Sequence, residues 1–352
     1  MAAFTHLHVH TQYSLLDGLS KIDELIDRCL ETGMNSMAVT DHGNMFGIKE
    51  FYDCAEAKNS ETKNEIKELE AQLAAETDEG KLDDLRTKLE ATKQKIFTPI
   101  FGCEAYVARV TPTNPTGSRF VHENKENGSG YHLVILAKNE TGYHNLCKII
   151  SSAWIDGLYY RPRIDRELLE KYHEGLIISS ACLAGEIPKA LAANNYEKAK
   201  ESVLWYKSIF GDDYYLELQR HKTDIPGADT TVYEQQQIVN AEIIKLAAET
   251  NTKLIATNDV HFVRKEQGTA HDLLICLSTG KKEQDSDRLH YTQQEWLKSP
   301  EEMAEIFADV PEALSNTQEI VAKIEPYKLQ HEAIMPMFDI PVEFGTDRKS
   351  VV

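Results

Sequence analysis

Residues 5–18 read THLHVHTQYSLLDG, and the fold is best worked out from this stretch. Its histidines, His6, His8 and His10, alternate with apolar residues, so in an extended strand the three imidazoles leave the same face. Neutral imidazole is the commonest side-chain metal ligand, and Asp17 follows within a short loop as a carboxylate that could join it. Taken alone, the stretch also fits a solvated, histidine-rich edge strand.

The same kind of signal recurs along the chain as apolar strands with metal-ligand residues at one end. These segments are 36–40 running into Asp41 and His42, 99–103 running into Glu104, 131–136 opening with His132, 175–180 running into Cys182, and 253–258 running into Asp259 and His261. A single His or Asp at a strand end is most often a loop residue. Together with the N-terminal stretch, however, there are six such segments, which are hard to explain by chance. His132 is the exception, because it enters its strand rather than leaving it.

Stretches with helical periodicity lie between these strands. They are 21–31 with Ser20 as a candidate N-cap, 140–153, 165–172, 195–209, 232–249 and 266–278. A further strand at 214–218 brings the number of strands to seven, most of them followed by a helix. Strict alternation predicts an α/β fold with a parallel sheet closed as a barrel and helices outside it. In such barrels chemistry collects at the C-terminal ends of the strands.

Composition limits the class of protein. The chain has 352 residues, a hydrophobic content of 41% and no apolar run of the roughly 20 residues that a membrane span needs. Its six scattered cysteines are typical of reduced thiols, which together with the missing signal peptide predicts a cytoplasmic protein. The net charge of −19 argues against a general nucleic-acid-binding surface. It still permits a phosphodiester held by metal ions, because such ions bring their own positive charge.

One local basic loop stands out from this acidic background. Residues 159–163 read YYRPR, so Arg161 and Arg163 lie beside two aromatic side chains. The arginines are candidate contacts for a substrate phosphate. A surface turn with packing tyrosines explains the same pattern equally well.

Residues 56–96 interrupt the alternation of strands and helices. Leucines and isoleucines spaced three and four apart occur in two runs separated by TDEG at 77–80, and charged residues fill most other positions. This pattern predicts an antiparallel helical hairpin with coiled-coil spacing that projects from the barrel. The hairpin is either an inert insertion or an arm that docks a partner.

The ligand-type pattern stops after about residue 285. Residues 299–323 predict an amphipathic helical stretch broken near Val310 and Pro311, and prolines at 326, 336 and 341 then indicate irregular chain. We therefore expect one domain over residues 1–285 and the start of a following region over 286–352. The end, 346–352, completes no element and is typical of a chain cut short or of a foreign tail.

Several motifs together resemble the polymerase and histidinol phosphatase (PHP) domain. They are HVHT at 8–11, LLDG at 15–18, TDHGN at 40–44, GCEAY at 102–106 and ATNDVH at 256–261. Two longer stretches, YHLVILAKNETGYHNL at 131–146 and GLYYRPRID at 157–165, are similar to the PHP domains that open the alpha subunits of bacterial DNA polymerase III. The resemblance covers roughly residues 4–285 without the hairpin.

The resemblance implies a distorted seven-stranded barrel that holds up to three metal ions. Matched motif by motif, the nine ligand positions of the family fall on His8, His10, Asp17, His42, Glu104, His132, Cys182, Asp259 and His261. His6 lies outside this set. Mixed imidazole, carboxylate and thiolate ligands suit zinc, or manganese or iron where carboxylates dominate. Asp259, His10 and Glu104 are the residues expected to be catalytic.

The resemblance also implies a reaction, namely hydrolysis of the 3′-terminal phosphodiester of DNA by a 3′–5′ exonuclease. The whole protein would be a DNA-directed DNA polymerase whose polymerase site lies outside this chain, and residues 286–352 would begin its palm. Partners would be the DNA 3′ end, the other polymerase domains, and replisome subunits such as the sliding clamp or a proofreading subunit. Two alternatives stay open: a free-standing phosphatase acting on a compound such as histidinol phosphate, and a non-catalytic scaffold.

Overall fold

The computed structural model describes residues 4–333 except 123–127, 224 and 227. The strands are β1 (Ser36–Val39), β2 (Thr98–Val107), β3 (Tyr131–Ala137), β4 (Leu158–Tyr159), β5 (Arg161–Ile164), β6 (Leu176–Ser179), β7 (Tyr214–Leu218) and β8 (Lys253–Ala256). The helices are α1 (Ile22–Glu31), α2 (Ile48–Ala75), α3 (Glu79–Lys93), α5 (Glu140–Ile155), α6 (Arg166–Lys171), α7 (Glu186–Ala192), α8 (Tyr196–Phe210), α9 (Thr231–Thr250), α10 (Gly268–Thr279), α11 (Pro300–Ile306) and α12 (Pro311–Lys323), with 3-10 turns η1 (Gly211–Asp213) and η2 (Lys265–Gln267).

Six of these strands form a curled sheet, and the N-terminal segment takes the place of a seventh strand in the ring, which confirms the predicted α/β barrel class. The order β1-β2-β3-β6-β7-β8 is continuous, and the N-terminal segment closes it through parallel bridges of His6 with Met37 and of Val9 with Val260. Backbone hydrogen bonds support the closure, since the amide of His10 donates to the carbonyl of Val260 over 2.7 Å. Strands β4 and β5 extend the sheet beside β2.

The prediction of an all-parallel sheet is wrong for one strand. β3 runs antiparallel to both of its neighbours, β2 and β6, whereas the other neighbours in the ring pair in parallel. Because β3 is reversed, its N-terminal end lies at the edge of the barrel where its neighbours have their C-terminal ends. His132, which enters β3, is therefore brought to the same edge as the residues that leave the other strands.

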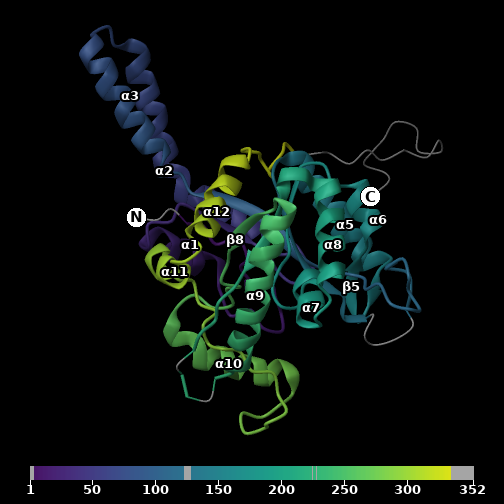
Figure 1. Ribbon diagram of the computed structural model, residues 1–352. Coiled ribbons are helices and arrows are strands. Elements are labelled where there is room, and N and C mark those ends of the chain that lie inside the picture. Colours follow the sequence, from purple (N-terminus) through teal and green to yellow (C-terminus); the bar gives the residue numbers. More distant parts are fainter. Residues whose placement is uncertain (1–3, 123–127, 224, 227, 334–352) are drawn as a thin grey trace, which may run out of the picture.

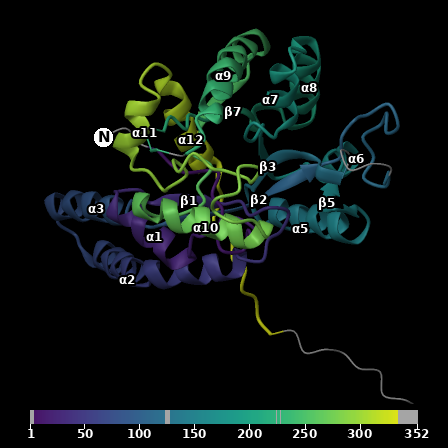
Figure 2. The same cartoon turned by 90° about the horizontal axis from the view of Figure 1, so that it is seen from below.

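Two buried clusters hold the barrel together. The smaller one contains a residue from each of the seven strands of the ring and fills the barrel interior: Leu7, Ala38, Ile100, Val134, Leu136, Ile177, Tyr215 and Ile255, with Ala181 and, from α12, Ile320. The larger cluster packs the helices onto the outside of the sheet (Figure 2). Leu7 belongs to the inner cluster and Val9 to the outer one, because the chain bends at His8 and the expected alternation breaks there.

Local sequence explains where several helices begin. The side chains of Asn139, Asp165 and Asn195 accept hydrogen bonds from the first turns of α5, α6 and α8, and Ser299 and Glu302 form a capping box at α11. The predicted cap of α1 is wrong, because its N-cap is Lys21, which makes no side-chain cap bond. Among the described residues, we find no helix with the length and apolar character that a membrane crossing requires.

The inserted hairpin consists of α2 and α3, which lie side by side and project from the body of the molecule (Figure 1). Helix α2 begins earlier than predicted, and its first turns bury Phe51, Tyr52 and Ala55 in the outer cluster of the barrel. The projecting parts bury only a few side chains, among them Leu69 and Leu89, which belong to neither cluster.

Residues after 285 pack on the barrel as far as the structure describes them. The chain at Trp296 pairs with Phe262, and α12 packs against β8. The phenol of Tyr215 donates a 2.8 Å hydrogen bond to Glu319, so α12 covers the N-terminal end of the barrel. The boundary at residue 285 and the start of a palm region stay predictions, and residues 334–352 lie outside the described residues.

Candidate metal centre

The inward-facing positions of the strands change from apolar to polar toward one end of the barrel. Side chains along a strand alternate with a period of two, so Tyr215, Glu217 and Gln219 follow one another on the inner side of β7. On the neighbouring strand, Ile255 of the interior cluster is followed four residues later by Asp259. The apolar positions fill the barrel, and the polar ones form a site at the C-terminal ends of the strands.

Glu104 is the centre of this site. Its fully buried carboxylate lies 3.1 Å from Nε2 of His8, 2.6 Å from Nδ1 of His42 and 2.8 Å from Nδ1 of His132. The thiol of Cys182 lies 3.6 Å from the same nitrogen of His132. Four strands or strand ends thus contribute side chains that surround one carboxylate.

Asp259 forms a second point of convergence. Its Oδ1 lies 3.2 Å from Nε2 of His8 and 3.1 Å from Nε2 of His10. The rings of His10 and His261 stack with centroids 4.4 Å apart. Asp259 has a φ of +46°, in the left-handed region that non-glycine residues avoid, so the backbone carries strain where it presents this carboxylate.

Asp17 completes the group of nine sequence-predicted ligands. Its carboxylate lies 3.4 Å from Nε2 of His42 and accepts a 3.1 Å hydrogen bond from the phenol of Tyr291. The structure therefore brings all nine residues into one continuous network of contacts. His6 lies apart from this network, with its Nε2 bonded to the backbone carbonyl of Lys298 over 2.8 Å.

Hydrogen bonds on the far side of three imidazoles fix their orientation. His8 donates from Nδ1 to the carboxylate of Glu217 over 2.7 Å, His10 donates from Nδ1 to Ser14, and His261 donates from Nδ1 to the carbonyl of Asp259. In each case Nε2 is left facing the site. Metal-binding histidines are typically held in this way.

Glu217 was not predicted from the sequence, although its carboxylate bonds to several side chains beneath the site. Its carboxylate accepts hydrogen bonds from His8, from Ser179 over 2.6 Å and from Gln219 over 2.9 Å, and it contacts the hydroxyl of Thr257. The signal was present in the strand YYLEL at 214–218, where a charged residue occupies a buried position of an apolar strand.

Two further supporting residues were not predicted in this role, although Asp41 was noted as a ligand-type residue at a strand end. Asp41 is buried and accepts hydrogen bonds from the backbone and hydroxyl of Thr11 and from Ser14, which in turn holds His10. Tyr291 reaches the site from the segment beyond the predicted domain boundary, and no local pattern marks it.

The surroundings of the site shift the pKa values of its histidines in opposite directions. Burial lowers the pKa of His10 to about 3, and the neighbouring imidazoles of His42 and His261 act in the same direction. Burial also disfavours the charged form of His8, but Asp259, Glu217 and Glu104 outweigh it and raise the pKa of His8 well above its usual value.

The two central carboxylates stay ionised. Burial alone would raise the pKa of Glu104, but His132, His8 and His42 hold this pKa well below its usual range. The pKa of Asp259 is lowered against the effect of burial by the nearby imidazoles of His8 and His10. Ionised carboxylates and the neutral imidazole of His10 are in the protonation states that bind metals, whereas His8 and His42, whose pKa values are raised despite burial by the neighbouring carboxylates, would release a proton when a metal binds.

The ligand atoms themselves fit a metal centre. Six buried polar atoms of the nine residues have no hydrogen-bond partner, namely Nε2 of His8 and His10, Oδ1 of Asp17 and Asp259, Nδ1 of His42 and Oε2 of Glu104. Burying such atoms unpaired is costly, and a bound cation would satisfy them. Three groups have ligand atoms that all lie within 4.8 Å of one another: His10, His42 and His261; His8, His10 and Glu104; and His42, Glu104 and His132.

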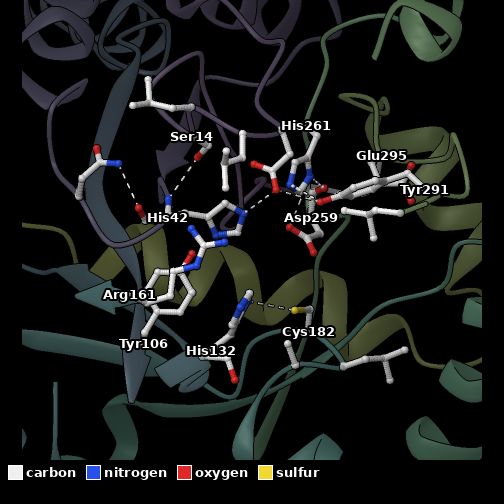
Figure 3. A pocket seen from close by; sticks show the side chains of 18 of the residues that line it. Ser14, His42, Tyr106, His132, Arg161, Cys182, Asp259, His261, Tyr291 and Glu295 are labelled. Atoms are coloured by element: carbon white, nitrogen blue, oxygen red, sulfur yellow. Dashed lines mark hydrogen bonds and ion pairs between the residues drawn. The ribbon is translucent and has the colours of Figure 1, made fainter. Parts of the chain in front are cut away.

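The site opens into a pocket of about 710 Å³. Six of the nine residues line it, whereas His8, His10 and Glu104 are fully buried beneath it. Figure 3 shows His42, His132, Cys182, Asp259 and His261 gathered around this hollow.

The structure separates the two predicted phosphate-binding arginines. Arg161 lines the pocket, with its guanidinium 5.6 Å from the ring centroid of Tyr106. Arg163 is fully buried and donates hydrogen bonds to the carbonyls of Gly157, Val121 and Arg119, so its guanidinium is used in holding the loops together.

The sequence of this chain is similar to those of known proteins. The profile of the PHP domain family matches residues 6–221. The DNA polymerase III subunit alpha of Borreliella burgdorferi is 41% identical over 346 residues, which cover 97% of this chain and 26% of that protein. The corresponding subunit of Campylobacter jejuni is 38% identical over 363 residues, covering 100% of this chain and 26% of that protein. The chain thus spans about a quarter of the length of these relatives.

A solved structure assigned as a metal-dependent phosphoesterase from Bifidobacterium adolescentis is a more distant match. It covers 88% of this chain and 96% of its own chain, with 10% identity and a TM-score of 0.29. A similarity this low says nothing about the metal centre.

Proposed function

Because the chain belongs to the PHP domain family, we propose that it hydrolyses the 3′-terminal phosphodiester of DNA, as a metal-dependent 3′–5′ exonuclease module of a DNA polymerase III alpha subunit. The observation that carries the proposal is the convergence of nine ligand-type side chains around Glu104, with six of their buried atoms lacking a hydrogen bond and several of these in close contact with one another. A scaffold that binds no metal has no need of such an arrangement.

The three groups of ligand atoms would hold up to three metal ions. Five imidazoles, three carboxylates and one thiol favour zinc, with manganese or iron as the alternatives. Ions bound there would supply Lewis acidity and positive charge at the phosphoryl oxygens. Their charge would also offset the carboxylates that otherwise repel a DNA backbone.

We assign the central roles to Asp259, His10 and Glu104. Of these three residues Asp259 alone lines the pocket, so it can approach the scissile phosphodiester. His10 and Glu104 lie beneath it and fix the positions of the ligands around them. Arg161 is the cation within the pocket that would contact a substrate phosphate.

In this proposal the remaining functions lie outside the chain. DNA polymerisation would be carried by the other domains of a longer, cytoplasmic polymerase, and the chain would contact those domains as well as the DNA 3′ end. Docking of the sliding clamp or of a separate proofreading subunit belongs to the alternative scaffold hypothesis.

The test combines metal analysis with two activities on one preparation. We expect bound zinc, manganese or iron by mass spectrometry, release of mononucleotides from 3′-recessed DNA, and no comparable turnover of histidinol phosphate. Turnover of histidinol phosphate but not of DNA would favour the free-standing phosphatase. A metal-replete protein that hydrolyses neither substrate, even when joined to its palm, would favour the scaffold.

A further inference from the structure

Exposed apolar side chains are concentrated around the mouth of the metal-site pocket. Among the described residues, fifteen large hydrophobic side chains are exposed, and seven of them line this one pocket: Leu15, Leu16, Phe46, Trp154, Leu158, Tyr160 and Leu289. Single exposed apolar residues are ordinary, but a contiguous group beside a polar site marks a binding surface.

The three aromatic members of this group, Phe46, Trp154 and Tyr160, form what we call the aromatic rim. Trp154, on α5, donates its indole N–H to the carbonyl of Gly43 over 2.8 Å, so its edge is fixed next to the loop that carries His42. The ring of Phe46 lies 6.4 Å from that of Trp154, between centroids.

Tyr160 is displayed at some cost to the backbone. It lies between β4 and β5 with a φ of +60°, in a region that bulky residues avoid, and its side chain is 68% exposed. Strain of this kind persists where the surrounding structure enforces it, and it is found preferentially at functional sites. The strained turn leaves an aromatic face at the mouth and places Arg161 inside the pocket (Figure 3).

The chemistry of the ligand follows from this order of groups. Flat apolar faces at the mouth, one guanidinium below them and a cluster of metal-ligand residues at the floor suit a chain of planar rings joined by phosphodiesters. Aromatic side chains bind the bases of single-stranded nucleic acid in this way, because every base offers a π-face for stacking. Within a duplex a base has both faces covered by its neighbours, and even the terminal pair leaves only one face open, so a paired end cannot offer successive bases to such a rim.

We propose that the aromatic rim stacks the unpaired bases at the 3′ end of a DNA strand, so that the site accepts a strand separated from its complement. The inference rests on the proposed function for its substrate, DNA, and adds to it the unpaired state and the residues that read it. Frayed or mismatched ends would thereby be selected over paired ones.

Binding, measured apart from hydrolysis, tests the inference. The probe is a fluorescein-labelled thymidine 12-mer with phosphorothioate linkages at its 3′ end, titrated with the 352-residue chain in the presence of Zn²⁺ and followed by anisotropy. A matched 12-mer lacks bases at its last three nucleotides, and a blunt duplex is the second comparison. We expect wild type to bind the base-bearing single strand at least about tenfold more tightly than either, since stacking contributes roughly 1–3 kcal/mol per base.

Substitutions then identify the residues responsible. Trp154→Ala and Tyr160→Ala should each weaken binding of the base-bearing strand about tenfold and leave binding of the abasic strand unchanged. Trp154→Phe, which keeps a stacking face but not the N–H bonded to Gly43, should retain most of the affinity. The control is Ile155→Ala, because Ile155 is the adjacent residue on α5, is 80% exposed and does not line the pocket. It should bind as wild type does.

The outcomes separate this inference from the proposed function. Hydrolysis of 3′ ends combined with rim variants that bind like wild type would overturn the inference and leave the function standing. Rim-dependent binding without hydrolysis by wild type would support the inference and contradict the function. Equal binding of abasic and base-bearing strands, a preference for the duplex, or no binding of single strands would overturn the inference and assign the rim to contacts with another protein segment.

Discussion

The mouth of the barrel and the helical hairpin use charged residues in opposite ways. At the mouth, Glu104 and its imidazole neighbours are removed from water and joined by contacts between residues far apart in sequence. On the hairpin, pairs such as Arg86 with Asp83 join residues three apart, at 3.1 Å, with side chains that are 62% and 80% exposed. Both regions are rich in charge, but only one of them buries it.

Buried charges indicate function more reliably than exposed ones. Exposed ion pairs contribute only about 0–1 kcal/mol each, because water screens them and the side chains lose freedom in pairing. Buried charges are costly unless hydrogen bonds, opposite charges or metals compensate them. A fold that keeps unpaired imidazole and carboxylate atoms in its interior therefore has a use for them, whereas the hairpin could exchange most of its charged residues freely.

The largest expected effect follows from Glu104→Gln. The amide loses the negative charge that faces three imidazoles, so we expect loss of bound metal and a fall in exonuclease activity of at least about 100-fold, since even residues behind the ligands of metal sites cost about 10–100-fold. Metal content and hydrolysis of 3′-recessed DNA are measured on one preparation, with circular dichroism as the check of folding.

Glu186→Gln is the matched control for this change. Glu186 is also a buried carboxylate, bonded to Arg166, Ser202 and Tyr206, but it lies outside the nine residues. We expect it to lower the melting temperature without changing the metal content. Full metal content and activity in Glu104→Gln would contradict the assignment of the metal centre.

A smaller effect is expected for Glu217→Gln, which acts behind the ligands. The neutral amide orients His8 less firmly, so metal affinity should fall about 10–100-fold while the ligand set stays complete. Competition with a chelator measures the affinity. Glu319→Gln is the control, because Glu319 bonds to Tyr215 on the same strand but at the opposite end of the barrel. Equal metal affinities for the two variants would argue against a supporting role for Glu217.

A structural feature of this protein could be predicted from the sequence where it depends on residues close together in the chain, and could not where it depends on residues far apart. The strands of the ring and the hairpin were predictable because apolar periodicity is a local signal, and the nine ligand positions were predictable because the short motifs that contain them resemble those of the PHP domain. The direction of β3 was not, since it depends on pairing between distant strands. His132 was thus the uncertain member until its strand proved to be reversed.

The supporting residues were harder to predict for the same physical reason. Glu217 acquires its role through His8, which lies 209 positions away in sequence, and Tyr291 meets Asp17 across 274 positions. A single acidic residue in an apolar strand was the one visible hint. Arg163 shows the converse, because the same basic motif contains one arginine that reaches the pocket and one that is bonded inside the protein.

Lys298 differs from both the metal site and the hairpin, because it is a buried charge surrounded mainly by uncharged groups. Its ammonium contacts the side-chain amide oxygen of Asn258 and the backbone carbonyl oxygen of Gln294 and lies 3.6 Å from the ring centroid of Trp296. Burial lowers the pKa of Lys298 to about 7. The unfolded chain keeps this proton up to a pH of about 10.5, so it binds more protons than the folded chain between pH 7 and 10.5. The folded state therefore gains stability from this group as the pH rises through that window.

Lys298→Met removes the titration and keeps the aliphatic stem. We expect the stability of wild type relative to the variant to increase by roughly 1–3 kcal/mol between pH 7 and pH 9.5. Urea denaturation of both proteins at the two pH values measures this difference, in which the other titrating groups cancel. A difference that does not change with pH would show that Lys298 is charged throughout or titrates as it does in the unfolded chain.

The smallest effect is expected where charge is exposed, on the hairpin. Replacing Glu61–Lys93 by a short Gly-Ser linker keeps Asn59, whose side chain exchanges two 2.8 Å hydrogen bonds with the backbone of Phe97. It also keeps Phe51 and Tyr52 in the barrel. The removed part includes Leu69 and Leu89, which lie outside both core clusters, so the facing helix accounts for their burial.

We therefore expect this deletion to change the melting temperature by less than about 3 °C and the metal content not at all. Phe51→Ala on the same helix is the contrasting control: its ring lies 6.0 Å from that of Phe101 in the core, and its removal should cost about 3–5 kcal/mol. If the deletion variant instead loses soluble expression or metal, the hairpin supports the barrel. The proposed difference between the metal site, which needs its charged residues, and the hairpin, which does not, would then be wrong. If the deletion leaves stability unchanged but impairs activity in the longer polymerase, the hairpin is an arm for a partner. The removed surface would then act through a contact with a segment outside this chain.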